Sequence, residues 1–156
     1  MTRILFICHG NICRSAAAEM IMKQMLRERN VTGIRVDSAA TSREEIGNDV
    51  YPPMKRALAA RGIRCEAHAA RQLTARDGEE YDLIIGMDQE NLARMRRILA
   101  PEAGDRIHLL MEYAGKPDQE IEDPWYSRRF DRVADQIAAG CEGLLEQLIT
   151  DDQKRE

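Results

Sequence analysis

The sequence has no excess of positive charge and no long apolar run, and each absence excludes a class of function. Its formal net charge is −4 over 156 residues, so electrostatics do not favour binding to bulk nucleic acid or to an anionic membrane. No apolar stretch approaches the roughly 20 residues that span a bilayer. The opening MTRILFICHG has an apolar core of about five residues, shorter than the roughly 7–15 of a signal peptide. We therefore expect a cytoplasmic protein without nucleic-acid or membrane partners.

The sequence also lacks a Cys-x-x-Cys pair. Its four cysteines are Cys8, Cys13, Cys65 and Cys141, and their spacing does not favour a structural zinc site, so no metal is expected. A cytoplasmic compartment keeps thiols reduced, which leaves a cysteine free to react. Cys65 and Cys141 are interpreted as structural, because Cys141 falls on the apolar face of a helical pattern.

Internal repeats, low-complexity segments and Gly/Ser linkers are absent as well. The length suits one domain with a single core, which we place at residues 1–149. The polar segment TDDQKRE, residues 150–156, is expected to be a disordered tail.

Strand-like and helix-like patterns alternate along the chain. Strands are predicted over residues 3–7, 34–40, 81–88 and 106–113, and helices over 15–26, 52–61, 89–99 and 130–148. Ser15 is a suitable N-cap for the first helix. This alternation predicts an α/β domain with a parallel sheet covered by helices on both faces. Ligands of such folds bind beyond the carboxyl ends of the strands, where the segment CHGNICRS, residues 8–15, lies.

The segment 8–15 has the composition of an anion-binding loop. Gly10 permits backbone conformations closed to other residues, and Asn11 tolerates the left-handed region better than most. A tight loop of this kind can turn successive N–H groups inward as an anion nest, and the following helix adds its positive end. Arg14 supplies a planar fork that matches two phosphate oxygens.

Cys8 would sit inside that loop. An isolated cysteine at the end of a strand is usually an inert buried residue, but dipoles that hold an oxyanion also stabilise a thiolate. Cys8 would then face a bound phosphate monoester and accept its phosphoryl group. Arg14 and the loop amides would stabilise the equatorial oxygens. The combination of strand, loop, arginine and helix therefore predicts a catalytic cysteine.

These residues resemble the low-molecular-weight protein tyrosine phosphatase family. The family carries C-x-G-N-x-C-R-S-P-x-A-E near its N-terminus, and the chain has CHGNICRSAAAE at residues 8–19. Ala16 stands where proline is usual, which should soften the helix start. The segments DSAATS (37–42), EIGN (45–48), HAARQL (68–73), MD with Asn91 after it, and EDPWY (122–126) agree in order and spacing. The resemblance implies a three-layer domain with a four-stranded parallel sheet, a phosphate-binding loop after the first strand, and neither a metal nor an organic cofactor.

The resemblance also implies roles for individual residues. Asp123 would be the general acid that protonates the leaving oxygen, a role that typically contributes 10²–10⁴-fold. The phosphate would be bound by His9, Gly10, Asn11, Ile12, Cys13, Arg14 and Ser15. The loop would be supported by Asn11, Ser15, Ser38 and His68, with Asp88 as a further supporting residue. Trp125 and Tyr126 would form a wall of the cleft that stacks on a substrate ring, although core or lid packing explains them equally well.

Three further positions bear on specificity and regulation. Glu44 stands where many relatives have an aromatic residue; a carboxylate there would disfavour acidic substrates and could receive a basic one, or it is only a solvated charge. Ile12 lacks the hydroxyl of the threonine found in relatives that act on phosphoarginine, so it favours phosphotyrosine, although packing under the loop explains it equally well. Cys13 either fills space or resolves an oxidised Cys8 as a disulfide.

The resemblance and the residues together predict a phosphatase acting on a phosphotyrosine protein or a small aryl phosphate. Its loop should also bind phosphate, sulfate or vanadate, and the protein should be a monomer or a weak dimer. Four alternatives remain: a phosphoarginine phosphatase, an arsenate reductase, a cysteine phosphocarrier, and a binding module without turnover. Arsenate reduction needs two further cysteines near the cleft, and YDLIIGMDQENLARM has none. A phosphocarrier would need neither Asp123 nor Arg14, and a binding module without turnover would not need the nucleophile and the acid that the sequence retains.

Overall fold

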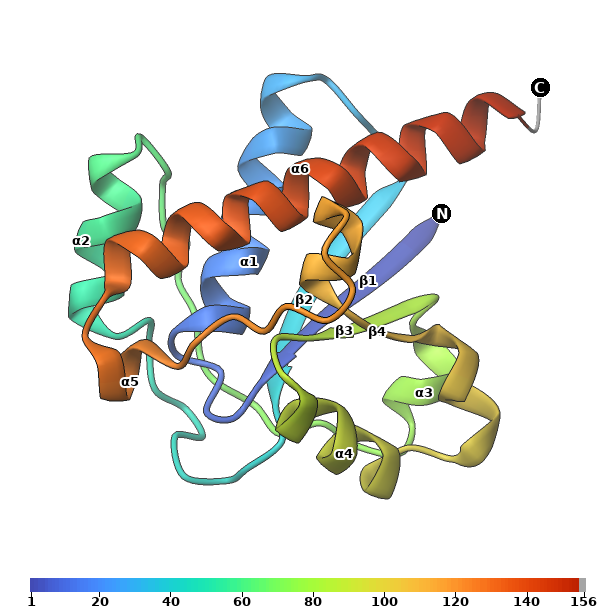
Figure 1. Cartoon of the computed structure of the whole chain (residues 1–156), viewed down its shortest axis with the longest axis horizontal. Coiled ribbons are helices and arrows are strands. Elements are labelled where there is room, and N and C mark those ends of the chain that lie inside the picture. Colours follow the sequence, from blue (N-terminus) through green and yellow to red (C-terminus); the bar gives the residue numbers. More distant parts are fainter. Residues whose placement is uncertain (155–156) are drawn as a thin grey trace.

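Strand β1 (Thr2–Cys8) lies at the centre of the sheet and ends at the predicted nucleophile. In this computed structural model, which describes residues 1–154, β1 pairs in parallel with β2 (Ile34–Ala40) on one side and β3 (Leu83–Gly86) on the other. The short strand β4 (Ile107–Leu109) completes the order β2-β1-β3-β4. The predicted four-stranded parallel sheet is confirmed (Figure 1).

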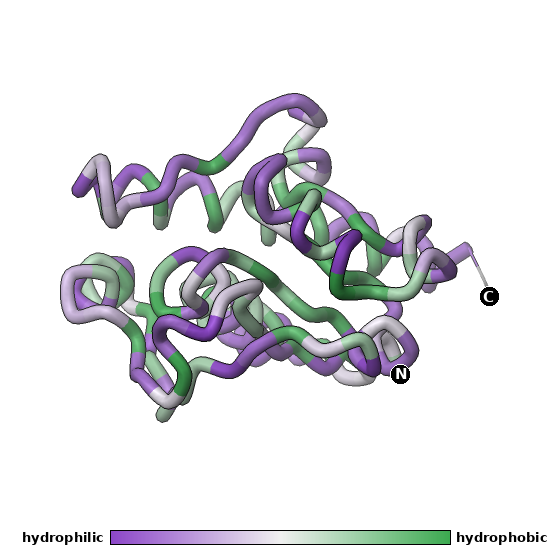
Figure 2. Tube along the Cα trace, turned by 90° about the horizontal axis from the view of Figure 1, so that it is seen from below, coloured by the Kyte–Doolittle hydropathy of each residue, from purple (hydrophilic) through white to green (hydrophobic). Residues whose placement is uncertain are grey.

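Helices cover both faces of the sheet because side chains alternate along β1. Ile4 and Phe6 pack under α1 (Arg14–Glu28), α2 (Pro52–Ala60) and α6 (Phe130–Lys154). Leu5 and Ile7 pack into a second core with α3 (Asp77–Glu80) and α4 (Gln89–Ile98). All four side chains are fully buried. Figure 2 shows hydrophobic segments gathered where the layers face one another and hydrophilic segments on the outer turns.

Three short helical elements and the long helix α6 make up most of the last third of the chain. The 3-10 helix η1 (Pro101–Arg106) precedes β4, and the 3-10 helix η2 (Leu110–Ala114) follows it. The short helix α5 (Pro124–Ser127) leads into α6. The apolar face predicted for α6 is buried, including Cys141. None of the helices within residues 1–154 combines the length and apolar character needed to cross a bilayer.

Several predicted boundaries are wrong, and hydrogen bonds explain the differences. β3 is shorter than residues 81–88 because Asp88 leaves the strand to cap α4. The predicted strand over 106–113 stops at Leu109, where Glu112 folds back and accepts from the Leu109 amide at 3.4 Å. The helix α1 begins at Arg14, so Ser15 lies inside the helix and is not its N-cap.

The expectation of a disordered tail is not met in the part of it that the structure describes. Helix α6 continues to Lys154, and the Thr150 hydroxyl donates to the Glu146 carbonyl at 2.9 Å within it. The boundary set at residue 149 therefore falls inside a helix. Residues 155 and 156 lie outside the described residues.

Candidate active site

One residue of the loop between β1 and α1 adopts a left-handed backbone conformation. Asn11 is fully buried and has φ of 60°, whereas Gly10 does not need a positive φ. The structure shows a different reason for a glycine at position 10: a Cβ there would lie 3.3 Å from Cγ of Glu45. Glycine therefore allows the 41–48 segment to pack against the loop, and asparagine supplies the turn.

The Asn11 turn is fixed from three sides. The His68 Nε2 donates to the Asn11 carbonyl at 2.6 Å, the predicted support. The Asn11 amide group donates to the Ser15 hydroxyl at 2.8 Å and accepts from the Arg71 backbone N–H at 3.3 Å. Since these bonds come from distant parts of the chain, the loop conformation is set by the whole fold.

Cys8 Sγ lies at the focus of this loop. The backbone N–H groups of Asn11 and Ser15 point to it at 3.3 Å and 3.4 Å, and the Ser15 hydroxyl lies 3.0 Å away. The sulfur also lies where the N-terminus of α1 contributes its positive end. The two N–H groups and the Ser15 hydroxyl are placed to donate to a negatively charged sulfur.

Arg14 is the buried cation of the site, with 2% of its surface exposed. Its Nη1 donates to an Asp88 carboxylate oxygen at 2.7 Å and to the Ile121 carbonyl at 2.9 Å. Burial lowers the pKa of Arg14, but neighbouring anionic groups, chiefly Cys8 and then Asp88, raise it above its ordinary value. Asp88 is in turn fixed as the N-cap of α4 by a reciprocal pair of bonds with Asn91. Asp88 therefore orients the guanidinium, in keeping with its predicted supporting role.

Asp123 approaches the same guanidinium from the far end of the chain. One of its carboxylate oxygens lies 3.7 Å from Arg14 Nη2, and the other accepts from the Trp125 N–H at 3.0 Å. Asp123 is thus the N-cap of α5. Cys8 and Asp123 line one cleft of about 410 Å³, and Trp125 and Tyr126 line it too. Trp125 and Tyr126 are 46% and 83% exposed, so they form an open wall.

The rim of this cleft carries more negative than positive charge. Glu44, Glu45 and Glu90 line it, and its Arg94 is paired with Glu90 at 3.1 Å. Glu44 contacts His9 Nε2 at 3.1 Å. Glu45 accepts from the Asn48 side-chain amide at 2.6 Å. Within residues 1–154, no Lys or Arg nitrogen pairs with either Glu44 or Glu45.

Cys13 and Ile12 are buried residues of the loop that also line the cleft. Their exposed fractions are 7% and 8%. Burial, together with the negative charge of Cys8, raises the pKa of Cys13 to about 12. Cys13 is therefore a neutral thiol at ordinary pH. All four cysteines are free.

Ser38 does not support the loop as the resemblance implied. It pairs with Phe6 in the sheet, before the carboxyl end of β2, and its hydroxyl donates to Glu19 at 2.5 Å. Glu19 also accepts from Lys23 at 2.6 Å. The buried Ser38–Glu19 bond ties β2 to α1 behind the site.

Sequence reasoning missed three contributors to the site: Glu19, Arg71 and Tyr51. Glu19 and Arg71 belong to segments that carry the resemblance, and their contacts with Ser38 and Asn11 cross the fold. Tyr51 belongs to none of those segments; its backbone N–H donates to the Ile12 carbonyl at 2.9 Å. The segments CHGNICRSAAAE and HAARQL, which hold Glu19 and Arg71, therefore offered a signal, and Tyr51 had none.

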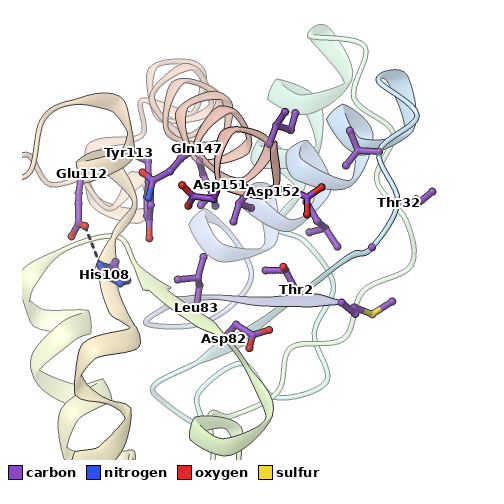
Figure 3. Close-up of a pocket in the computed structure, with 17 residues that line it drawn as sticks. Thr2, Thr32, Asp82, Leu83, His108, Glu112, Tyr113, Gln147, Asp151 and Asp152 are labelled. Atoms are coloured by element: carbon purple, nitrogen blue, oxygen red, sulfur yellow. Dashed lines mark hydrogen bonds and ion pairs between the residues drawn. The ribbon is translucent and has the colours of Figure 1, made fainter. Parts of the chain in front are cut away.

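A larger cavity of about 600 Å³ lies at the opposite, amino end of the strands (Figure 3). Its carboxylates are Asp82, Glu112, Asp151 and Asp152, and Glu112 is bound to His108 at 3.0 Å. No lysine, arginine or cysteine is among the residues that line it in the described chain. Its charge therefore repels a phosphate ester, and the predicted catalytic residues Cys8, Arg14 and Asp123 line the smaller cleft.

A thiol inside an anion nest, a fixed guanidinium and a facing carboxyl group define a class of protein: a phosphatase that uses a cysteine nucleophile. The chain agrees with this class in comparisons with known proteins. The family model described as low molecular weight phosphotyrosine protein phosphatase matches residues 3–154, and the chain belongs to this family. It is accordingly a protein tyrosine phosphatase, a hydrolase of phosphoric monoesters.

Individual relatives support this assignment over nearly the whole chain. The low molecular weight phosphotyrosine protein phosphatase 1 of Drosophila melanogaster is 36% identical over 152 residues, which cover 94% of this chain and 97% of the relative. The crystal structure of YfkJ from Bacillus subtilis aligns with a TM-score of 0.92 at 33% identity, covering 97% and 96% of the two chains. The structure of Vibrio vulnificus Wzb in complex with benzylphosphonate aligns with a TM-score of 0.83 at 25% identity, covering 94% and 98%.

Proposed function

We propose that the chain hydrolyses phosphotyrosine through a phosphoryl group carried on Cys8. The Cys8 thiolate attacks phosphorus while the bond from phosphorus to the phenolic oxygen breaks. The electron pair of that bond goes to the phenolic oxygen, which takes a proton from Asp123. Arg14 and the loop N–H groups stabilise the equatorial oxygens. The observation that carries this proposal is the pair of backbone N–H groups, of Asn11 and Ser15, that donate to Cys8 Sγ, with the Ser15 hydroxyl 3.0 Å from it.

The second half of the reaction restores the enzyme. Water attacks phosphorus and gives a proton to the Asp123 carboxylate, and the bond from sulfur to phosphorus breaks. Cys8 leaves as the thiolate and phosphate departs. Because the step needs a reduced thiol, we place the protein in a reducing compartment such as the cytoplasm.

Hydrolysis of 4-nitrophenyl phosphate by single-cysteine variants tests the proposal. Cys8→Ser should abolish turnover, because a serine hydroxyl is not ionised in this loop. Cys65→Ser makes the same atomic change at a half-buried position outside the cleft and should keep the wild-type rate. Turnover by Cys8→Ser near that rate would refute the role of Cys8.

We further propose that the preferred substrate carries basic residues beside its phosphotyrosine. Glu44 and Glu45 line the cleft, and within residues 1–154 no Lys or Arg nitrogen pairs with either of them. Trp125 and Tyr126 also line the cleft, and the Wzb neighbour was solved in complex with benzylphosphonate. An aryl phosphate would thus stack on Trp125 while flanking lysines or arginines meet the carboxylates.

Two phosphotyrosine peptides that differ only in flanking Lys or Glu residues test this preference. Each exposed ion pair contributes about 0.2–1 kcal/mol, so kcat/KM should favour the Lys peptide roughly two- to tenfold at low salt. The preference should shrink with added salt and in the Glu44→Gln/Glu45→Gln variant. Glu102→Gln, an exposed carboxylate before β4, should leave the preference unchanged. Equal kcat/KM for both peptides with wild-type enzyme would refute it.

We also propose that Cys13 protects Cys8 from irreversible oxidation. Peroxide converts the Cys8 thiolate to a sulfenic acid, and Cys13 then forms the disulfide as water leaves. The negative charge of Cys8 is one cause of the raised pKa of Cys13, and this cause disappears when Cys8 becomes a neutral sulfenic acid. After peroxide treatment, dithiothreitol should restore wild type more fully than Cys13→Ser. Equal recovery would show that Cys13 protects nothing.

Alternative reactions on the same scaffold have less support. Cys8 and Cys13 are the cysteines that line the cleft, which leaves no further thiol there to pass a disulfide outward, as arsenate reduction needs. The buried Ile12 side chain offers no polar atom for a guanidinium. A panel of phosphotyrosine, phosphoserine and phosphoarginine peptides, with Cys8→Ser as control, separates these substrates.

A further inference from the structure

Tyr51 lies between the two halves of the active site, the phosphate loop and the acid segment. It directly precedes α2 and is half-buried. Its backbone N–H donates to the Ile12 carbonyl at 2.9 Å. Its ring centroid lies 5.0 Å from that of Trp125, with the planes tilted by 53°. One residue therefore touches both halves.

The turn after α5 closes on the same ring. Arg128 Nη1 donates to the Tyr51 phenol oxygen at 3.3 Å, and its guanidinium lies 5.5 Å from the Tyr51 ring centre and 5.1 Å from that of Phe130. Arg128 has φ of 63°, which a residue other than glycine adopts seldom and keeps only where contacts hold it. The Tyr51 and Phe130 rings, 5.9 Å apart, are those contacts.

The acid itself depends on this arrangement. α5 is a single turn, too short to be stable through its own hydrogen bonds, and its Trp125 and Tyr126 side chains are open to solvent. Asp123 is held by one bond to the Trp125 N–H at 3.0 Å and by Arg14 at 3.7 Å. A shift of Trp125 would therefore move the carboxyl group.

We propose that Tyr51 is a positioning residue for Asp123: its ring holds Trp125 and thereby keeps the acid over the leaving oxygen. The role rests on the proposed assignment of Asp123 as general acid. It differs from a role in phosphate binding, because the only bond from Tyr51 to the phosphate loop uses the backbone N–H, which most substitutions retain.

The dependence of kcat/KM on the leaving group tests the proposal. A poor leaving group such as phenol needs the proton from Asp123, whereas 4-nitrophenol needs it far less. Displacement of a catalytic group by about 1 Å can cost up to roughly 10²-fold. Tyr51→Leu should therefore lower kcat/KM about tenfold for phenyl phosphate and less than about threefold for 4-nitrophenyl phosphate.

Three controls accompany the series. Tyr51→Phe keeps the ring and should stay close to wild type. Inhibition by inorganic phosphate should be equally strong in wild type and Tyr51→Leu. Trp125→Leu removes the same ring contact from the other side and should also lower kcat/KM more for phenyl phosphate than for 4-nitrophenyl phosphate. This variant provides the test if Tyr51→Leu fails to fold.

Three results would overturn the role of Tyr51. The first is an equal loss of kcat/KM for both esters in Tyr51→Leu, and the second is phosphate inhibition that weakens in proportion to that loss. The third is a change of kcat/KM in Tyr51→Phe as large as in Tyr51→Leu. A different result would show that Asp123 is not the general acid: Asp123→Asn would have the same dependence of kcat/KM on the leaving group as wild type. The proposed role of Tyr51 would then be refuted as well. If Asp123→Asn steepens the slope, Tyr51→Leu should add no further steepening in that background; an added change would overturn the proposal.

Discussion

Asn11 carries the conformational cost of the phosphate loop. Its φ of 60° is unfavourable for a residue with a Cβ by about 1–2 kcal/mol, and its side chain offsets this with bonds to Ser15 and the Arg71 N–H. Asn11→Ala should lower the free energy of unfolding by roughly 2–4 kcal/mol. Asn11→Gly loses the same bonds but adopts the turn freely, so it should be more stable than the alanine variant by about 1 kcal/mol. Urea unfolding measures both, and the reverse order would contradict this account.

Cys13 gives the folded state an alkaline limit. Burial and then the charge of Cys8 raise its pKa from the ordinary 9.0 to about 12. Between these values the unfolded chain has lost a proton that the folded chain retains. Stability is therefore full below about pH 9 and falls as the pH rises toward 12, by up to about 1.4 kcal/mol per pH unit.

Cys13→Ser should flatten this dependence, because serine does not ionise there. Burial raises the pKa of Cys141 as well, so some slope should remain in the variant. Urea unfolding at a series of pH values from 8 to about 10.5 gives the slope. Equal slopes in wild type and Cys13→Ser would argue against a protonated Cys13.

Among the elements, α6 and η2 approach each other closely at Gly143. A Cβ on Gly143 would lie 1.9 Å from the Tyr113 carbonyl oxygen, which is backbone and cannot move aside. Alanine usually stabilises a helix interior by about 0.5–1 kcal/mol relative to glycine. Here the clash should reverse the sign, and Gly143→Ala should lose about 1–3 kcal/mol.

Gly104→Ala is the matched control for this prediction. A Cβ there meets nothing within 4 Å and φ is not positive, so the change should stay within about 0.5 kcal/mol. Thermal or urea unfolding of the two variants measures the change in the free energy of unfolding for each. A Gly143→Ala protein as stable as wild type would show that the helices can separate at low cost.

Elements were predictable from sequence where burial alone decides them. β1 and the apolar face of α6 have strong patterns, and both are found where the pattern places them. The pattern fails for Leu110 and Met111, which stay buried while the backbone turns into η2. An apolar run predicts which residues are buried, but it does not predict where a strand ends. Here the strand ends where the Glu112 carboxylate accepts from the Leu109 N–H, a contact that cannot be read from the sequence.

The residues of the candidate active site also differ in whether sequence alone could predict them. Cys8, Asn11 and Arg14 were predictable because one continuous loop contains them. Asp123 came only from the family resemblance, because no spacing brings residue 123 to residue 8. Tyr51 could not be predicted, since its role arises from ring contacts with Trp125 that exist only in the fold.

For the molecule as a whole, the two ends of the sheet differ in the groups that they present to an anion. The carboxyl end presents the N–H groups of the loop and Arg14 to an anion. The amino end presents the four carboxylates of the larger cavity, among them Asp82 and Asp151 (Figure 3). An anion should therefore bind at one end alone.

Titration with inorganic phosphate, followed by amide NMR, examines this polarity. Shifts should be confined to residues 8–15 and to the segments that contact them, including Arg71 and Asp123. Thr32, Asp82 and Tyr113, which line the other cavity, should not respond at low phosphate. Saturable shifts at that end would contradict the charge argument.

The account as a whole depends on Cys8 as the atom that receives the phosphoryl group. Its most direct test mixes Asp123→Ala, in which release by water is slowed, with 4-nitrophenyl phosphate, and denatures the protein within the first turnover. Phosphorus NMR and mass spectrometry then locate the group. We expect about one phosphoryl group per chain on the Cys8 sulfur and none in the Cys8→Ser/Asp123→Ala variant. A phosphoryl group on another residue, or turnover that continues without Cys8, would contradict the account.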